Sequence, residues 1–243
     1  MSAVDETTAA EPPAGPYPAV LSARLEEPLN RWLWIVKWLL LIPHYIVLIV
    51  LWICVVVATI VAWFAILFTG RYPRGIFDFN LGVLRWSWRV SFYGYSALGT
   101  DRYPPFSRQR EPDYPATLDV EYQEEHSRWR TFGRIVLAIP QLLIVGILEG
   151  GGAGFTVGHG HYQEIATPWS GLIGLLALIV GFALLFTRRY LRDLFDFIVG
   201  LNRWVFRVGV YVLLMTDRYP PFRYDGGTDE PGARVEPAVP PSL

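Results

Sequence analysis

The feature that most constrains this chain is an apolar run of thirty-seven residues, Leu33 to Thr69, in which Lys37 is the only formal charge. As one straight α-helix the run would be roughly 55 Å long, at about 1.5 Å per residue. The hydrocarbon core of a bilayer is only about 30 Å thick. The run is therefore too long for one perpendicular crossing and barely long enough for two, and it predicts an integral membrane protein.

Composition supports the same class of protein. Hydrophobic residues make up 52% of the chain and charged residues only 18%, whereas soluble domains carry about 25% charged residues. The net charge of −1 hides a segregation, because the apolar blocks are nearly uncharged and Arg residues gather at their flanks. The single Cys54 lies inside the apolar run, so no intramolecular disulfide is expected.

The chain also contains two copies of one unit. Arg31-Trp32 recurs 97 positions later as Arg128-Trp129, and Asp78 recurs 118 positions later as Asp196. Both copies close with Thr-Asp-Arg-Tyr-Pro-Pro-Phe, at 100–106 and 216–222. The expected organisation is a disordered tail at 1–16, repeat one at 17–106, a linker at 107–113, repeat two at 114–222 with a Gly-rich outer loop at 149–168, and a disordered tail at 223–243.

The second copy is longer because the Gly-rich loop interrupts its apolar block. The loop contains no Lys or Arg, and it separates Phe132–Leu148 from Trp169–Thr187. Each of these pieces is close to the length of a membrane crossing. Arg residues flank the pair on both sides, so the positive-inside rule places both flanks in the cytoplasm and the loop outside. The second copy is therefore predicted to be a transmembrane hairpin.

Basic residues flank the apolar run of the first copy in the same way. A hairpin that turns near Val50 to Cys54 would keep both flanks in the cytoplasm, although this segment has no Gly, Pro or Asn to mark a turn. The alternative is an interfacial helix that ends at Pro43, followed by one long crossing from His44 to Phe68. The similarity between the copies favours the hairpin, and with it a multi-pass protein of the bacterial inner membrane whose termini are cytoplasmic.

A helix with a polar stripe is predicted after each apolar block, over 75–98 and 194–215. The stripe consists of Asp78, Arg85 and Arg89 in the first copy and Asp196, Arg203 and Arg207 in the second. Spacings of seven and four place these side chains within about 40° on a helix. The pattern predicts an amphipathic helix at the membrane interface, with the stripe as a head-group site or as a set of ion pairs. A third crossing in each copy, with a buried stripe, is the alternative.

Two short segments are predicted to form strands. Apolar and polar residues alternate from Leu118 to Tyr122, and Val20 to Leu25 occupies the equivalent place in the first copy. We expect the two segments to pair on the cytoplasmic side. The fold class is thus an all-α integral membrane protein with a tandem duplication, supplemented by a small strand pair.

Residues that carry chemistry are scarce. The sequence has no phosphate-binding Gly loop, no nucleophile elbow and no HExxH motif, so we expect no enzyme and no cofactor. His44, which is replaced by Gln141 in the second copy, is interpreted as a hydrogen-bonded structural group, and His126 as a solvated residue. The loop residues His159, His161 and Glu164 form the only metal-like cluster, and whether they bind a metal stays open.

The chain resembles a family of bacterial membrane proteins whose shared domain is a domain of unknown function, number four-three-eight-nine. The resemblance rests on Phe-Thr-Gly-Arg-Tyr-Pro-Arg at 68–74, Phe-Asp-Phe at 77–79, Arg-Trp-Ser-Trp-Arg at 85–89 and the closing Asp-Arg-Tyr-Pro-Pro-Phe. It covers both repeats, although Arg188 replaces Gly70 and Leu191 replaces Pro73 in the second. The resemblance implies an inner-membrane protein, often duplicated in actinobacteria-like genomes, with no assigned reaction or ligand.

Two functions are compatible with this sequence. The first is a non-enzymatic inner-membrane accessory or scaffold protein of a cell-envelope or transport assembly. The alternative is a lipid-binding or lipid-moving protein that uses the two Arg stripes as head-group sites, because Arg binds phosphate in a bidentate manner. The expected partners are membrane lipids and either a membrane protein or a second copy of the chain, and no nucleic acid is expected.

Overall fold

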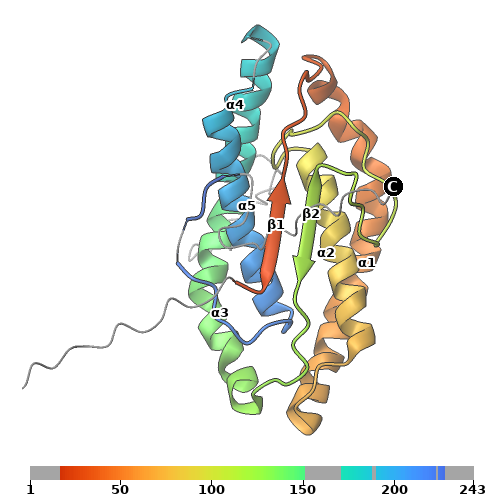
Figure 1. Ribbon diagram of the computed structural model, residues 1–243, viewed down its shortest axis with the longest axis vertical. Helices are drawn as coiled ribbons and strands as arrows, with labels where there is room; N and C mark the ends of the chain where they lie inside the picture. The colour runs from red at the N-terminus through yellow and green to blue at the C-terminus, as the bar shows by residue number, and fades with distance from the viewer. Residues whose placement is uncertain (1–16, 151–170, 188–189, 223, 228–243) are drawn as a thin grey trace, which may run out of the picture.

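The computed structural model describes residues 17–150, 171–187, 190–222 and 224–227, so the predicted tails and the predicted outer loop fall mostly outside it. These residues are mainly helical, with one two-stranded sheet. In chain order the elements are β1 (Ala19–Ala23), α1 (Leu33–Thr69), α2 (Arg74–Tyr93), β2 (Ala116–Val120), α3 (Arg128–Glu149), α4 (Leu172–Thr187) and α5 (Arg192–Val212) (Figure 1).

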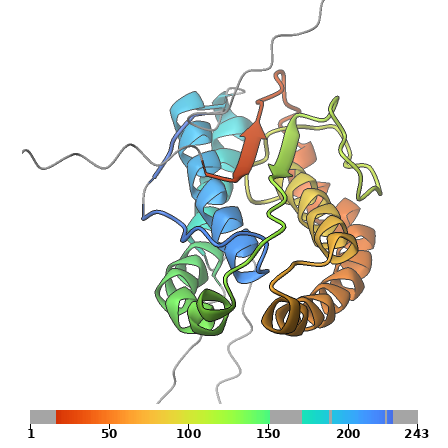
Figure 2. The same cartoon turned by 60° about the horizontal axis from the view of Figure 1, so that its bottom comes forward.

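The elements form three layers (Figures 1 and 2). The sheet is the first layer, α2 and α5 form the second, and α1 with α3 and α4 forms the third. Neighbouring residues of α2 contact both flanking layers: the Trp88 indole donates to the Ser22 carbonyl of β1 at 3.4 Å, and the Trp86 indole donates to His44 Nδ1 of α1 at 3.0 Å. The part of α1 from His44 to Trp52, which also bonds to Ser87 of α2, therefore lies across α2 from the sheet.

The predicted strand pair is confirmed, and its register shows how the copies are related. β1 and β2 are antiparallel, and Leu21 pairs with Leu118, which is its counterpart 97 positions later. Pairing between equivalent residues places a pseudo-twofold axis at the centre of the sheet. Each strand also contacts the middle helix of the other copy, because Arg85 of α2 donates to the Leu118 carbonyl and Arg203 of α5 donates to the Leu21 carbonyl. The copies are therefore strand-exchanged and share one core.

The predicted hairpin in the first copy is wrong, because α1 is one continuous helix with Pro43 inside it. Its buried residues recur every seven positions along the side that faces α2, and they include Leu41, Leu48, Val55 and Ala62. Packing along this whole side keeps the helix continuous through residues 50–54, which contain no Gly, Pro or Asn to favour a turn. The helix ends at Gly70, whose φ of 75° is left-handed and whose N–H bonds to the Ile66 carbonyl.

The two helices predicted to form the hairpin of the second copy are present at nearly the expected positions, but their described residues are not arranged side by side as a hairpin requires. The contacts that the two helices make with α5 show how they are oriented. Arg134, near the start of α3, lies over the ring of Tyr211 at the end of α5, whereas Leu148 and Ile173, where α3 ends and α4 begins, both pack on Leu201 in the middle of α5. Helices α3 and α4 therefore lie in line along α5, and together they occupy the place that α1 occupies in the first copy.

Helices α2 and α5 confirm two predicted helices but not their predicted place at a membrane interface. Their apolar residues, such as Val83 and Trp88 on α2 and Ile198 and Val210 on α5, are fully buried. The outer helices cover one side of α2 and α5, and the sheet covers the other. Acyl chains are therefore not needed to cover these apolar faces.

Candidate functional site

The Arg stripe of the first copy faces the sheet and the segment after α2. Arg85 donates to the Leu118 carbonyl at 2.9 Å and forms an ion pair with Asp119. Arg89 is buried, and it donates to the carbonyls of Gln109, at 3.1 Å, and Ser107. Both guanidinium groups therefore connect α2 to neighbouring backbone.

The stripe of the second copy is buried even more completely. Arg203 has no exposed surface, and it donates to the carbonyls of Leu21, Asp225 and Gly227. Arg207 forms an ion pair with Asp225 at 2.8 Å. These bonds attach the segment that follows the closing motif to α5 and to β1, so the geometry explains a requirement for Arg without a lipid phosphate.

The acidic members of the stripes lie apart from the Arg pairs. Asp78 is exposed and forms an ion pair with Arg74, one turn earlier, at 3.2 Å, so the predicted pairing of Asp78 with Arg85 and Arg89 is wrong. The backbone carbonyl of Asp196 accepts a hydrogen bond from the Tyr224 hydroxyl at 3.3 Å. The stripes are thus not brought together into one site.

A duplicated ion pair, which was not predicted from the sequence, connects each closing motif to an outer helix. Lys37 of α1 is buried, and its Nζ donates to the Thr100 carbonyl at 2.6 Å, lies 3.2 Å from Asp101 and sits 4.6 Å above the ring of Tyr93. The sequence did carry a signal, because each apolar block contains a cation at an equivalent position and each closing motif contains an Asp.

In the second copy the equivalent pair joins Arg134 to Asp217. His126, expected to be solvated, is instead buried: its Nδ1 lies 2.7 Å from Asp217 and its Nε2 lies 3.0 Å from the Gln123 carbonyl. Burial alone would raise the pKa of Asp217, but hydrogen bonds from His126 and the Ser127 N–H, with the charge of Arg134, lower it to about 2. The carboxylate therefore stays ionised.

The interpretation of His44 and Gln141 as hydrogen-bonded structural groups is confirmed. His44 accepts from the Trp86 indole, and Gln141 accepts from the equivalent Trp204 indole at 2.8 Å. The amide of Gln141 also donates to the Pro220 carbonyl at 3.0 Å. Both residues thus satisfy a buried indole N–H where the outer helix meets the middle helix.

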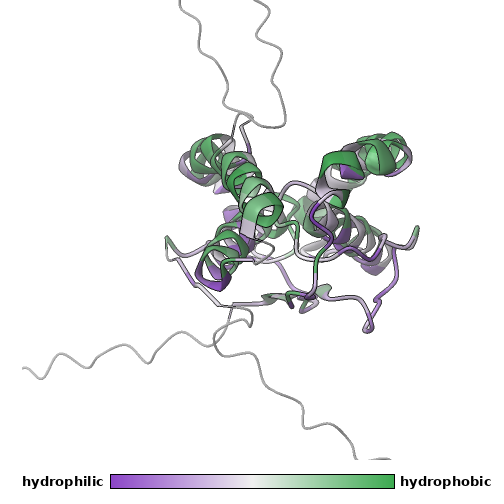
Figure 3. Cartoon of the chain, turned by 90° about the horizontal axis from the view of Figure 1, so that it is seen from above, coloured by the Kyte–Doolittle hydropathy of each residue, from purple (hydrophilic) through white to green (hydrophobic). Residues whose placement is uncertain are grey.

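The most extensive candidate surface is apolar. We use the term outer layer for α1, α3 and α4, whose sides turned away from the sheet carry exposed large hydrophobic residues along their length (Figure 3). Examples are Ile46 at 61% exposed, Phe68 at 73%, Trp129 at 90% and Phe182 at 49%. Polar residues gather on the side of the sheet and its loops. A single apolar surface of this extent marks a site of interaction with lipid or protein.

By length and composition, α1 is able to cross a membrane, and this supports association with a membrane. Among the described residues α3 would be a second such helix only if its two mutually bent parts, 128–134 and 136–149, formed one span. Helix α4 is apolar but shorter.

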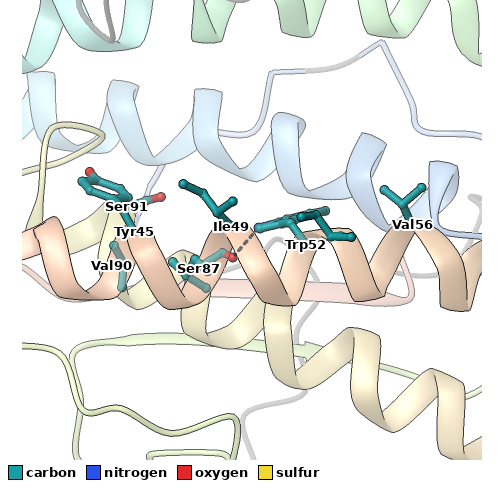
Figure 4. A pocket seen from close by; sticks show the side chains of 9 residues that line it. Tyr45, Ile49, Trp52, Val56, Ser87, Val90 and Ser91 are labelled. Carbon is teal, nitrogen blue, oxygen red and sulfur yellow. Dashed lines mark hydrogen bonds between the residues drawn. The ribbon is translucent and has the colours of Figure 1, made fainter.

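A groove of about 460 Å³ extends the outer layer sideways between α1 and α2 (Figure 4). It is lined by Tyr45, Leu48, Ile49, Trp52, Ile53, Val56, Ser87, Val90 and Ser91. Within this lining, the Trp52 indole of α1 donates to the Ser87 hydroxyl of α2 at 3.1 Å. The second copy has Glu149 and Val205 at the two equivalent positions, so this indole–hydroxyl bond is not repeated there.

Metal-binding geometry is not found within the part of the chain that the structure describes, where no three His, Cys, Asp or Glu side chains cluster. His159, His161 and Glu164 lie outside that part. The question of a metal at these loop residues therefore stays as the sequence left it.

Comparison with known proteins agrees with the duplication. No curated protein and no solved structure matches the chain. A family model described as a domain of unknown function, DUF4389, matches residues 31–108 and 166–223, which together make up more than half of the chain and fall in the two repeats. The chain therefore belongs to the DUF4389 family, of which it carries two tandem copies.

Proposed function

We propose that this protein is a non-enzymatic accessory or scaffold protein of a membrane. Its outer layer anchors it in lipid, and its sheet side presents a polar surface to a partner in a cell-envelope or transport assembly. The observation that carries the proposal is the separation of the two surfaces, with exposed apolar residues on α1, α3 and α4 and polar residues around the sheet.

The contacts that the charged residues make within the protein support a structural role for them rather than head-group binding. Arg85, Arg89, Arg203 and Arg207 all bond to carbonyls or carboxylates of the protein itself. Lys37 joins an outer helix to a closing motif. Residues that the sequence offered as ligand-binding groups thus fix the positions of helices, strands and connecting segments.

Anchoring is tested first, by flotation of the purified protein with vesicles of phosphatidylcholine and phosphatidylglycerol. We expect the protein to float with the vesicles. A variant with Ile46→Ser, Ile53→Ser and Ile60→Ser, all on the exposed side of α1, should float less, whereas Glu121→Ser, Glu124→Ser and Glu125→Ser on the polar side should not reduce flotation. Failure of the unmodified protein to float would refute a membrane anchor.

Docking is tested separately, by affinity purification of a C-terminally tagged chain from membranes in mild detergent. We expect at least one membrane or envelope protein in stoichiometric amount. The same partner should be lost when the three Glu→Ser changes are made on the polar side, and retained in the outer-layer variant. Recovery of the chain alone, under conditions in which it floats with vesicles, would refute docking and leave only the anchor.

A further inference from the structure

We infer that the outer layer lies within a single leaflet, with α1, α3 and α4 parallel to the membrane plane, so that the chain enters the bilayer without crossing it. This orientation rests on the proposed membrane anchor and replaces the transmembrane hairpins expected from the sequence. The occupant of the apolar surface is thus the acyl region of one leaflet, with head groups around its edge.

The first argument is the length of the apolar surface. Exposed hydrophobic residues extend along α1 from Ile35 to Phe68, which is about 50 Å of helix. A crossing would cover about 30 Å of that length and leave the remainder in head groups and water. A helix that lies in the plane of the leaflet keeps the whole surface in contact with acyl chains.

The second argument is the position of the sheet. Arg85, Trp86 and Trp88 contact β2, α1 and β1 respectively, so the strands lie at the same level as the middle of α1 (Figure 1). A crossing of α1 would place the sheet at the depth of the hydrocarbon core. Asp119 of β2 forms an ion pair with Arg110, which lies exposed in the loop before this strand. Loops exposed to lipid do not occur at that depth, and exposed charged side chains are costly there.

The third argument is the edge of the outer layer, where both Tyr-Pro-Pro-Phe segments lie beside the outer helices. The Tyr103 hydroxyl donates to the Leu40 carbonyl of α1 at 3.0 Å, and the Pro220 carbonyl accepts from Gln141 of α3. Phe106 and Phe222 are more than half exposed. In the proposed orientation these aromatic residues lie on both flanks at the level of the head groups, where aromatic residues are enriched in membrane proteins.

The charges at the start of α3 complement an anionic leaflet. Arg128 and Arg130 are exposed on the first turn of this helix, on either side of the exposed Trp129, and the exposed Phe132 follows. Basic residues close to an anionic membrane surface are attracted to it. Basic and aromatic residues thus meet at the boundary of the apolar surface, as expected for a segment at head-group depth.

The orientation is tested by measuring the depth of spin labels in vesicles of phosphatidylcholine and phosphatidylglycerol. Single cysteines replace Leu39, Ile46, Ile53 and Ile60 in a Cys54→Ala background; these four exposed residues are seven positions apart and cover about 31 Å of α1. Depth is taken from the ratio of collision rates with oxygen and with a water-soluble nickel chelate. We expect similar depths at all four positions, all within one leaflet.

The outcomes separate the orientation from the anchor. Depth that rises from Leu39 toward Ile46 and Ile53 and falls again at Ile60 would mean a crossing, and would overturn the inference while leaving the anchor intact. Labels shielded from both reagents, with spin–spin broadening, would mean that a second copy covers the surface, and would also overturn the inference. Loss of flotation would overturn the anchor itself.

Two further labels guard against misfolded variants. A label at Glu121, exposed after β2, should be fully accessible to the nickel chelate in the same vesicles. The otherwise unmodified chain, labelled at its exposed native Cys54, should report a position within one leaflet. A midplane position for Cys54 would overturn the inference without any substitution.

Discussion

Single residues hold the closing motif against the outer helix in each copy. Asp101 is within 3.2 Å of Lys37, and Asp217 accepts from Arg134, His126 and the Ser127 N–H. Removing one partner of a buried pair leaves the other charge without a counter-charge. The resulting loss of folding stability is far larger than the difference in stability between the intact pair and an apolar replacement of both residues. The identical Asp of both closing motifs therefore has a structural explanation.

Asp217→Asn should destabilise the protein by about 3–5 kcal/mol, because Arg134 would remain buried without its counter-charge. The measurement is denaturant unfolding in one mild detergent, followed by circular dichroism. Asp113→Asn, at an exposed position, is the matched control and should change stability by less than about 0.5 kcal/mol. Equal effects of the two substitutions would contradict the buried pair.

The low pKa of Asp217 predicts a dependence of stability on pH. Its folded pKa of about 2 lies below its ordinary value of 3.8, so the ionised carboxylate contributes stability above pH 4 and loses that contribution as pH falls toward 2. The contribution is about 2 kcal/mol. The difference in unfolding free energy between the wild type and Asp217→Asn should therefore shrink between pH 4 and pH 2. A constant difference across this range would refute the assignment.

Arg203→Lys should destabilise the protein by about 2–3 kcal/mol, because a single ammonium cannot reproduce the bonds to Leu21, Asp225 and Gly227. The lipids that copurify, measured by mass spectrometry, should be unchanged. Arg192→Lys, at an exposed position, serves as the control and should alter neither quantity. Loss of anionic lipid without loss of stability would restore the head-group interpretation of the stripe.

At the scale of the element, α1 is apolar on all sides, yet only one row of it is buried. Leu48 faces α2 and is buried, whereas Ile46 is exposed. Leu48→Ala should therefore cost about 2–5 kcal/mol, and Ile46→Ala less than about 1 kcal/mol, by unfolding in the same detergent. Similar losses at both positions would mean that another surface covers Ile46 in the isolated protein.

The sequence predicted the elements better than their directions. The repeat, the strand pair, both middle helices and the role of His44 follow from local patterns, and the structure contains all of them. The hairpin predictions failed because a run of only apolar residues does not indicate which side of the helix is covered by protein and which by lipid. The positive-inside rule assumes that a helix crosses the membrane. It therefore could not predict that helices α3 and α4 lie in line.

The Arg stripes show the same limit at the candidate site. Their spacing correctly placed Arg85 and Arg89 on one side of a helix, and their counterparts on another. In each copy this side of the helix faces the strand of the other copy and the segment that follows its own repeat. Arg85 thus contacts Leu118, and Arg203 contacts Leu21. Such contacts join residues far apart in sequence, so no local pattern could reveal them.

On the scale of the whole molecule, strand exchange makes each repeat incomplete by itself. β2 of the second repeat supplies Leu118 and Asp119 to Arg85 of α2, and β1 of the first repeat supplies Leu21 to Arg203 of α5. Tyr17 and Tyr114 follow the same exchange, since their hydroxyls donate to the backbone of the other copy's closing motif. Neither half should therefore be stable alone.

Splitting the chain in the linker tests this expectation. Residues 1–110 and 111–243, expressed together with a tag on one half, should copurify as a one-to-one complex in mild detergent. The mixed pair is favoured over a pair of identical first halves, because Ser22 would then stand opposite Arg85 where Asp119 stands now. Asp119→Ser should accordingly weaken the mixed complex, whereas Glu121→Ser, two residues further and exposed, should not. Two halves that each purify as stable, folded monomers would show that the strands do not hold the repeats together.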